Sequence, residues 1–191
     1  KKVVYFDLSN SSADIDGQCA ALFEHIATNL RGEVMSRVEV IVSPSFFNKF
    51  IQHPKVQKFW LNWSNAEKLA QVDRTKTGGQ LGRSFVYQNI MFREYYGLAP
   101  VKIGGALVSK PFVDADKGHA YPAGTLDTFK TYDAPPDDIR YVNEMPGAEV
   151  FISPKILDHG QGVELLTQSN QLALVRRPEV LVEVNAGANP G

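Results

Sequence analysis

The ten residues that decide the fold are Val38-Glu39-Val40-Ile41-Val42-Ser43-Pro44-Ser45-Phe46-Phe47. Their first half alternates valine with other residues, which is the two-residue period of a strand. Ser43 can then accept a hydrogen bond at a helix N-terminus, and Pro44 suits the first helical position. We therefore predict a strand that leads directly into a helix, whose apolar residues continue with Phe50 and Ile51.

The segments on either side predict further helices. Upstream, Ser11 to Asp14 are rich in N-cap residues and precede an amphipathic helix that a glycine ends at Gly32. The apolar residues of this helix recur at steps of three and four and are Ile15, Cys19, Leu22, Phe23, Ile26 and Leu30. Downstream, the second helix breaks at His53-Pro54 and resumes from Val56 to Leu61, and a short helical piece is expected over Ala66 to Gln71.

The remainder of the chain predicts mostly strands. Residues 73–84 contain three glycines and almost no apolar side chain, so we predict a mobile surface loop there. Strands are expected within 85–96, 101–103, 150–152, 163–166, 172–175 and 180–184, with tight turns at Gly104-Gly105 and at 160–162. One further helix start is expected at Ala134 to Asp138, continuing through Ile139, Tyr141 and Val142. Helices that gather early and strands that gather late favour an α+β fold over an alternating parallel sheet.

Composition excludes several classes of protein. The chain has 191 residues, 43% of them hydrophobic, and a formal net charge of -1, which is unlike the positive excess of a nucleic-acid binder. One cysteine cannot form an internal disulfide or a cysteine metal cluster. No run approaches the length of a membrane span, and the N-terminus does not resemble a signal peptide. Because the chain opens without methionine inside a strand-like run, we expect it to be a fragment.

No catalytic or cofactor motif is present. The glycines of residues 78–84 lack the spacing and lysine of a phosphate-binding loop, and no nucleophile elbow occurs. His25, His53, His119 and His159 are scattered, and we interpret them as surface or packing residues. Cys19 lies on the apolar face of its helix, which is typical of a buried small hydrophobe. We therefore expect no metal, no cofactor and no catalytic residue.

Charge is distributed unevenly along the chain. Residues 48–83 carry a net charge of +5, and residues 111–150 carry -5 and include Asp114 and Asp116. Opposite patches on one chain suit head-to-tail contact between identical subunits, which closes rings. Two unrelated solvated surfaces would give the same pattern, and the aspartates also fit solvated turns.

Several segments, taken in order, resemble a known family. The helix that follows Ser12, the strand into Ser43-Pro44, and Ile51 to Val56 are similar to the element order of tailed-phage major capsid proteins. Ala120 to Thr125 and Phe129 to Pro135 resemble the Phe-Pro-x-Gly-Thr and Tyr-x-Ala-Pro segments of the lambda-like major head proteins, the capsid protein E family.

The end of the chain carries the most specific match. Gly162 to Leu172 and Arg177 to Val182 are similar to that family's Glu-Gln-Ser-Asn-Pro-Leu and Arg-Pro-x-x-Leu-Val ending, with Gln171 in place of the proline. The N-terminal arm, extended hairpin and spine helix that such proteins carry before this region are absent from this sequence.

The resemblance implies a Hong-Kong-ninety-seven-type capsid fold of the α+β class. Residues 11–145 would form the axial domain, residues 146–185 the returning strands of the peripheral domain, and residues 1–10 and 186–191 a connecting segment and tail. Arg74, Lys76 and Arg83 would then approach a neighbouring subunit, with Asp114 and Asp116 as further interface candidates. The boundary is expected near Met145-Pro146-Gly147.

The function implied is that of a head subunit that assembles with itself into an icosahedral shell. Scaffold, portal and decoration proteins and packaged DNA, bound without sequence specificity, are the further partners implied, with no membrane. Assembly would take place in the bacterial host cytoplasm and the product would be the virion head. The alternative is a small-ligand-binding or hydrolytic domain that uses Asp114, Asp116, His119 and Tyr121 on one loop.

Overall fold

The computed structural model describes residues 2–62, 81–139 and 146–190. Its α-helices are α1 (Ile15–Asn29), α2 (Pro44–Gln52) and α3 (Pro54–Asn62). Its first strands are β1 (Lys2–Tyr5), β2 (Arg37–Val42), β3 (Leu81–Tyr87), β4 (Ile90–Tyr95), β5 (Leu98–Ile103) and β6 (Ala106–Pro111). The later strands are β7 (Lys117–Ala123), β8 (Phe129–Asp133), β9 (Phe151–Ile156), β10 (Val163–Gln168), β11 (Gln171–Val175) and β12 (Val182–Asn185), with 3-10 turns η1 (Asp158–Gly160) and η2 (Pro178–Val180). The predicted α+β class is confirmed.

The chain divides into two compact units, which we name by their architecture. The sheet unit consists of residues 1–126 and 177–191, and the ribbon unit consists of Asp127–Arg176. The boundary expected near residue 145 therefore falls inside the ribbon unit, because β8 pairs with β11 and draws the segment before residue 145 into that unit.

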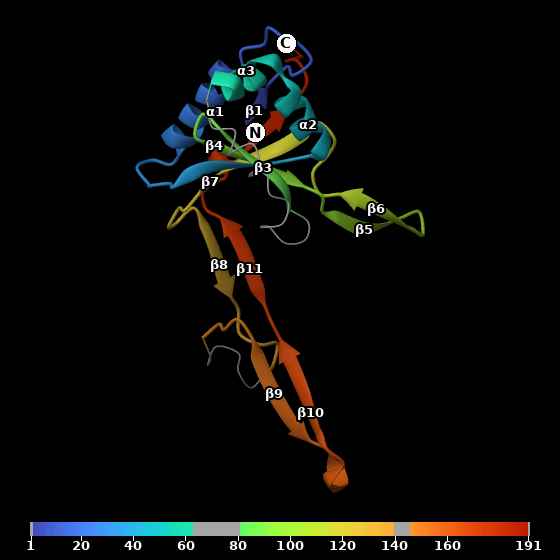
Figure 1. Ribbon diagram of the computed structural model, residues 1–191. Coiled ribbons are helices and arrows are strands. Elements are labelled where there is room, and N and C mark those ends of the chain that lie inside the picture. Colours follow the sequence, from blue (N-terminus) through green and yellow to red (C-terminus); the bar gives the residue numbers. More distant parts are fainter. Residues whose placement is uncertain (1, 63–80, 140–145, 191) are drawn as a thin grey trace. The chain divides into compact units, whose positions relative to one another are not determined.

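A six-stranded mixed sheet forms the centre of the sheet unit, in the order β1-β12-β7-β2-β4-β3. β1 lies parallel to β12 and β2 lies parallel to β4, whereas the other neighbours are antiparallel. Side chains that alternate along β2 bury Val38, Val40 and Val42 on the face that the helices cover. Figure 1 shows the helices gathered at one side of this sheet.

The strand-to-helix junction forms as its sequence predicts. Ser43 is the N-cap of α2, and its Oγ accepts a hydrogen bond from the Phe46 amide at 3.4 Å. Pro44 occupies the first position of the helix. His53 adopts an extended backbone between α2 and α3, which confirms the predicted break. Its ring is buried and lies 3.0 Å from the Asn10 carbonyl oxygen, so it packs inside the unit.

An aromatic cluster centred on Phe50 joins α2 to the sheet. The Phe50 ring stacks on Phe92 of β4 at a centroid distance of 4.4 Å, and it meets the ring of Tyr87 edge-on at 5.7 Å. Phe6 contacts Phe46, Phe50 and Phe92 at 5.8–6.2 Å. These rings are almost completely shielded from solvent, so the cluster is part of the buried core of the sheet unit.

The ribbon unit is built from two antiparallel pairs, β8 with β11 and β9 with β10 (Figure 1). The predicted tight turn at 160–162 lies between β9 and β10, next to η1. None of its described residues belongs to the buried hydrophobic cluster, and Ile152, Ile156 and Leu165 are 63%, 76% and 63% exposed. Two-stranded ribbons of this kind are only marginally stable in water when nothing packs on them.

Three local predictions fare differently. Residues 81–84 of the expected loop belong to β3, because this segment pairs with β4 around a bulge. The rest of the expected loop, residues 73–80, lies outside the described residues, as does the expected helical piece Ala66 to Gln71. The expected helix start at Ala134 to Asp138 is wrong for the residues described: the Ala134 amide instead bonds to the Asn170 carbonyl oxygen at 2.8 Å, which extends the ribbon. Residues 140–145, with Tyr141 and Val142, also lie outside the described part of the chain.

Removing the ring at the centre of the aromatic cluster tests this account of the core. Phe50→Ala should lower the free energy of unfolding by about 3–5 kcal/mol, because it leaves a cavity among rigid rings. Urea denaturation followed by circular dichroism measures the loss. Val34→Ala, at a position that is 78% exposed, is the control and should change stability by less than about 0.5 kcal/mol. Equal losses in the two variants would contradict the assignment.

Candidate subunit interface

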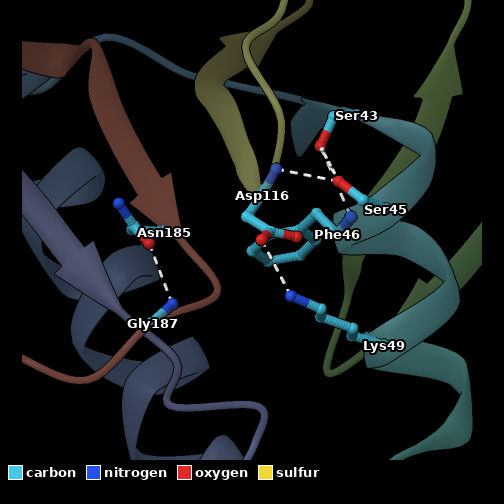
Figure 2. Close-up of polar contacts among 7 residues, drawn as sticks. All are labelled: Ser43, Ser45, Phe46, Lys49, Asp116, Asn185 and Gly187. Carbon is cyan, nitrogen blue, oxygen red and sulfur yellow. Dashed lines mark hydrogen bonds and ion pairs between the residues drawn. The ribbon is translucent and has the colours of Figure 1, made fainter.

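Asp116 lies in the turn before β7 and is bound by residues of α2 (Figure 2). The Lys49 ammonium lies 2.8 Å from Asp116 Oδ2, and the Asp116 amide donates to Ser45 Oγ at 2.8 Å. The hydrogen bond from Lys49 lowers the pKa of Asp116, although partial burial acts in the opposite direction. The charge of this interface candidate is therefore compensated within the subunit.

The same turn is tied to the end of β12. The Ala186 amide donates to the Asp116 carbonyl oxygen at 2.9 Å. The Gly187 amide donates to Asn185 Oδ1 at 2.8 Å, as Figure 2 shows. Asp116 itself has a φ of 60°, a left-handed conformation that aspartate tolerates better than most residues. Asp116 therefore lies in a turn, as its sequence context predicts, and the hydrogen bond from Ala186 ties this turn to the end of β12.

Asp114 differs from Asp116 because most of its side chain is open to solvent. Its Oδ2 lies 3.6 Å from Lys117 Nζ, and the same ammonium lies 3.5 Å from Glu183 Oε1. Exposed pairs of this length contribute little to stability. Asp114 therefore keeps a carboxylate at the surface that a second molecule could reach.

Arg83 lies on β3 and forms a bidentate ion pair with a buried carboxylate. Its Nε and one terminal nitrogen lie 2.9 and 3.0 Å from the two oxygens of Glu94, whose side chain is fully buried. Burial alone would raise the pKa of Glu94, but the hydrogen bonds from Arg83 and Tyr96 outweigh it and hold the pKa below its ordinary value. The guanidinium also lies 4.9 Å from the ring centroid of Phe47 and bonds to the Asn48 side chain. Arg83 therefore has a structural role inside the subunit, and its role at an interface stays a prediction.

Arg74 and Lys76, the other two basic candidates, lie outside the described residues. Among the candidates that the structure describes, only Arg83 and Asp116 have short ion pairs with a partner on another element. The sequence signal for these partners was weak, because Lys49 and Glu94 look like ordinary surface charges on a helix and a strand.

The catalytic alternative is not supported by the geometry. Asp116 binds Lys49 on the helix-covered face of the sheet, whereas the Tyr121 hydroxyl donates to Glu39 Oε2 at 3.0 Å on the other face. Burial, with the nearby Glu39 charge, raises the pKa of Tyr121 to about 12. His119 is exposed opposite Glu183, and Asp114 pairs loosely with Lys117. These four residues therefore do not converge on one site.

Two further features of the described residues concern metal binding and the cysteine. They contain no group of three or more histidine, cysteine, aspartate or glutamate residues that could hold a metal ion. Cys19 is fully buried, and burial, reinforced by Asp16, raises the pKa of its thiol to about 12, as expected for a packing residue. The longest described helix has 15 residues, and none of the helices is long and apolar enough to cross a membrane.

A model of the family described as phage major capsid protein E matches residues 1–186. The chain belongs to this family. The match covers the helices, the six-stranded sheet and both ribbons, and it confirms the resemblance found in the sequence.

Individual capsid proteins agree with the family assignment. The major capsid protein of Salmonella phage Felix O1 (isolate Felix O1-VT1) is 30% identical over 210 residues, covering 100% of this chain and 56% of that protein. The major capsid protein of Pseudomonas phage KPP10 is 27% identical over 187 residues, covering 96% of this chain and 52% of that protein. The chain therefore spans about half the length of the curated relatives it matches.

A solved structure shows the same fold at low sequence identity. It is a prophage protein of E. coli CFT073, described as a proposed capsid protein, with a TM-score of 0.57 and 12% identity. The likeness covers 94% of this chain and 50% of that one. The α+β capsid fold of this family member is therefore shown by structure as well as by sequence.

The Arg83–Glu94 pair yields a pH-dependent prediction. Arg83→Met should cost about 3–5 kcal/mol of unfolding free energy at neutral pH, because it leaves a buried carboxylate without its cation. The wild-type pKa of Glu94 is depressed, so its contribution is complete above its ordinary value of about 4.5 and is lost as the pH falls through the folded-state value. In the variant, burial without Arg83 raises the pKa of Glu94, so the cost of Arg83→Met should begin to shrink above pH 4.5 and should shrink further below it, which urea denaturation across pH measures.

Lys49→Met is the matched control, since it removes the cation of a half-exposed pair on the same unit. It should cost about 0–1 kcal/mol at neutral pH. A cost for Arg83→Met that is as small as this, or that grows at low pH, would show that the Arg83–Glu94 pair is not what stabilises β3 against β4.

Proposed function

We propose that the complete protein is the major head subunit of a tailed phage or prophage and that many copies assemble into an icosahedral shell around DNA. The family match over residues 1–186 carries this proposal. Its role would be mechanical and not enzymatic: each contact between subunits is modest, and repetition around closed rings makes the whole stable.

The burial pattern supports assembly. A subunit that worked alone would cover its apolar residues, yet the described part of the ribbon unit exposes large apolar side chains along all four of its strands. Contiguous exposed apolar surface is typical of protein–protein contact sites. The sheet unit, in contrast, has a complete core and can act as the rigid body that carries these contacts.

The two compact units suggest how the subunit is divided in the shell. We assign the sheet unit to the axial domain, near the five- and six-fold axes, and the ribbon unit to the returning strands of the peripheral domain. This assignment places the boundary at residue 126 in place of the expected residue 145. It also adds to the axial domain residues 1–10 and 177–191, which were expected to form the connecting segment, the end of the peripheral strands and the tail. The basis is the pairing of β1 with β12, which places both ends of the chain in one sheet.

Other partners follow from the proposed role. Packaged DNA would face the shell without sequence-specific contacts, since the chain has a net charge of -1. Scaffold, portal and decoration proteins are further proposed partners, and assembly in the bacterial host cytoplasm would deliver the protein to the virion head.

Negative-stain electron microscopy of the complete protein tests the proposed function. Expression of the full reading frame, with its scaffold and protease supplied, should give closed shells or capsomer rings of uniform size. A matched sample of residues 1–191 alone should stay monomeric or weakly associated, because it spans about half of the length of its relatives. Only small discrete particles from the complete protein would contradict a shell role.

The basic segment before β3 supplies a second test. Charge reversal of Arg74 and Lys76 in the complete protein should lower particle yield roughly tenfold or more if this segment contacts a neighbouring subunit. Arg83 is left unchanged because its loss would leave the buried Glu94 carboxylate without its cation and so destabilise the subunit itself. Reversal of Lys2, a charged residue of the edge strand β1, is the control, and unchanged yield in the Arg74 and Lys76 variant would remove this segment from the interface.

A further inference from the structure

The chain passes between its two compact units at two places, from Leu126 to Asp127 and from Arg176 to Arg177. The second place carries two consecutive arginines, and each of them forms an ion pair within its own unit. Arg176 pairs with Asp127 of the ribbon unit, whereas Arg177 pairs with Glu33 of the sheet unit. The covalent path from the ribbon unit into the sheet unit is therefore held on both sides of a single peptide bond.

The two ion pairs differ in how far water reaches them. The Arg176 and Asp127 side chains are 48% and 41% exposed, so their pair contributes little to stability. The Arg177 and Glu33 side chains are 27% and 8% exposed, so water and salt screen their attraction much less. The Glu33 amide also donates to the Leu30 carbonyl oxygen at 3.2 Å, which ties Glu33 to the end of α1. The pair on the sheet side is thus the more firmly held of the two.

The segment that Arg177 begins leads directly into the centre of the sheet. η2 follows at once, and Leu181 alone separates it from β12, which lies between β1 and β7. Val180 of η2 is fully buried, and the Glu179 carbonyl oxygen lies 3.2 Å from Nε2 of His25 on α1. A displacement of Arg177 is therefore transmitted through η2 to a central strand of the six-stranded sheet.

Packing holds η2 only in part. A cavity of about 710 Å³ opens beside it, and its lining includes His25 and Asn29 of α1 together with Pro178 and Leu181. Pro178 is exposed, and Leu181 is 38% exposed. Segments with few buried apolar contacts open locally at a low free-energy cost. η2 thus has room to move, and the ion pair of Arg177 restrains it at the end that faces the ribbon unit in the sequence.

We propose that the Glu33–Arg177 pair is a strain-relief anchor, which stops displacements of the ribbon unit during assembly from reaching β12. The inference rests on the proposed function, since contact with neighbouring subunits is what displaces the ribbon unit. Positions near five- and six-fold axes differ in the angle between neighbours, so the ribbon unit is loaded differently in each. The anchor takes up this load at the connection between α1 and β2, and the six-stranded sheet stays intact.

Hydrogen exchange measured by mass spectrometry tests the anchor in the complete protein, both before assembly and in particles. In the wild type, the peptide that covers η2 and β12 should exchange no faster in particles than in free subunits. In Arg177→Gln it should exchange roughly tenfold faster in particles than in free subunits, because the load of assembly then reaches β12. Glu33→Gln removes the other partner of the same pair and should give the same result.

Arg176→Gln is the matched control, since it makes the same substitution one residue earlier and removes the exposed pair of the ribbon unit. Its particles should stay within about threefold of wild-type exchange over η2 and β12. Faster exchange of Arg177→Gln in free subunits and particles alike would show that the pair only stabilises the sheet unit, which would overturn the inference. Particles whose exchange over β12 is the same in every variant would also overturn it, while leaving the proposed function intact.

A charge exchange keeps the test decisive when the single variants do not assemble. Glu33→Arg together with Arg177→Glu restores an ion pair of reversed polarity, and its particles should exchange within about threefold of wild type over β12. Failure of this double variant to restore both particles and protection would contradict the anchor. If the complete wild-type protein forms no particles at all, the proposed function fails, and this inference fails with it.

Discussion

The stacking of Phe50 on Phe92, at 4.4 Å between ring centroids, fixes α2 against the six-stranded sheet, and other features of the sheet unit follow from it. Because Phe92 must face the helices, the alternation along β4 turns Ile90 and Glu94 to the same face. The carboxylate of Glu94 is thereby forced into the interior. Arg83 of the adjacent strand neutralises it and covers Phe47 at the same time. A hydrophobic contact thus explains why a charged pair is buried here.

The two units differ in how much of their apolar surface is covered. In the sheet unit, three helices cover one face of the sheet, and the opposite face carries polar side chains such as Glu39 and Tyr121. In the ribbon unit, all four strands expose large apolar side chains, such as Phe129, Ile152, Leu165 and Leu172. A subunit of a shell can tolerate this arrangement, because surface that would cause aggregation of a solitary protein becomes buried when neighbours arrive.

Much of this architecture can be predicted from the sequence where local signals are strong. The β-branched run before Ser43-Pro44, the cap at Asp14 and the glycine pair at 104–105 each predict the element that the structure contains. The sequence did not predict the β3–β4 turn at Gln88 and Asn89, which lies inside the segment 85–96 that was expected to form strand. Both residues have positive φ, yet neither is the glycine that usually marks such a turn.

Sequence patterns could not predict which segments far apart in the chain pair with one another. The helix expected after Ala134 does not form: β8, directly before it, pairs with β11 more than thirty residues later, and the Ala134 amide donates to the Asn170 carbonyl oxygen. The partners of Asp116 and Arg83 were missed for the same reason, since Lys49 and Glu94 have no distinctive sequence context. Family resemblance was needed to pass from a fold class to a function, because the sequence contains no catalytic or cofactor motif.

The parallel pairing of β1 with β12 has a consequence for synthesis. β12 is translated after the other strands that the structure describes, yet it is inserted between β1, the earliest of these strands, and β7, which is made much later. Until it emerges, Val4 and Ala120 lack the strand that will lie between them, and the sheet is split into two parts. The nascent chain can therefore nucleate α1, β2 and α2 early, but the six-stranded sheet is completed only after the whole ribbon unit has been translated.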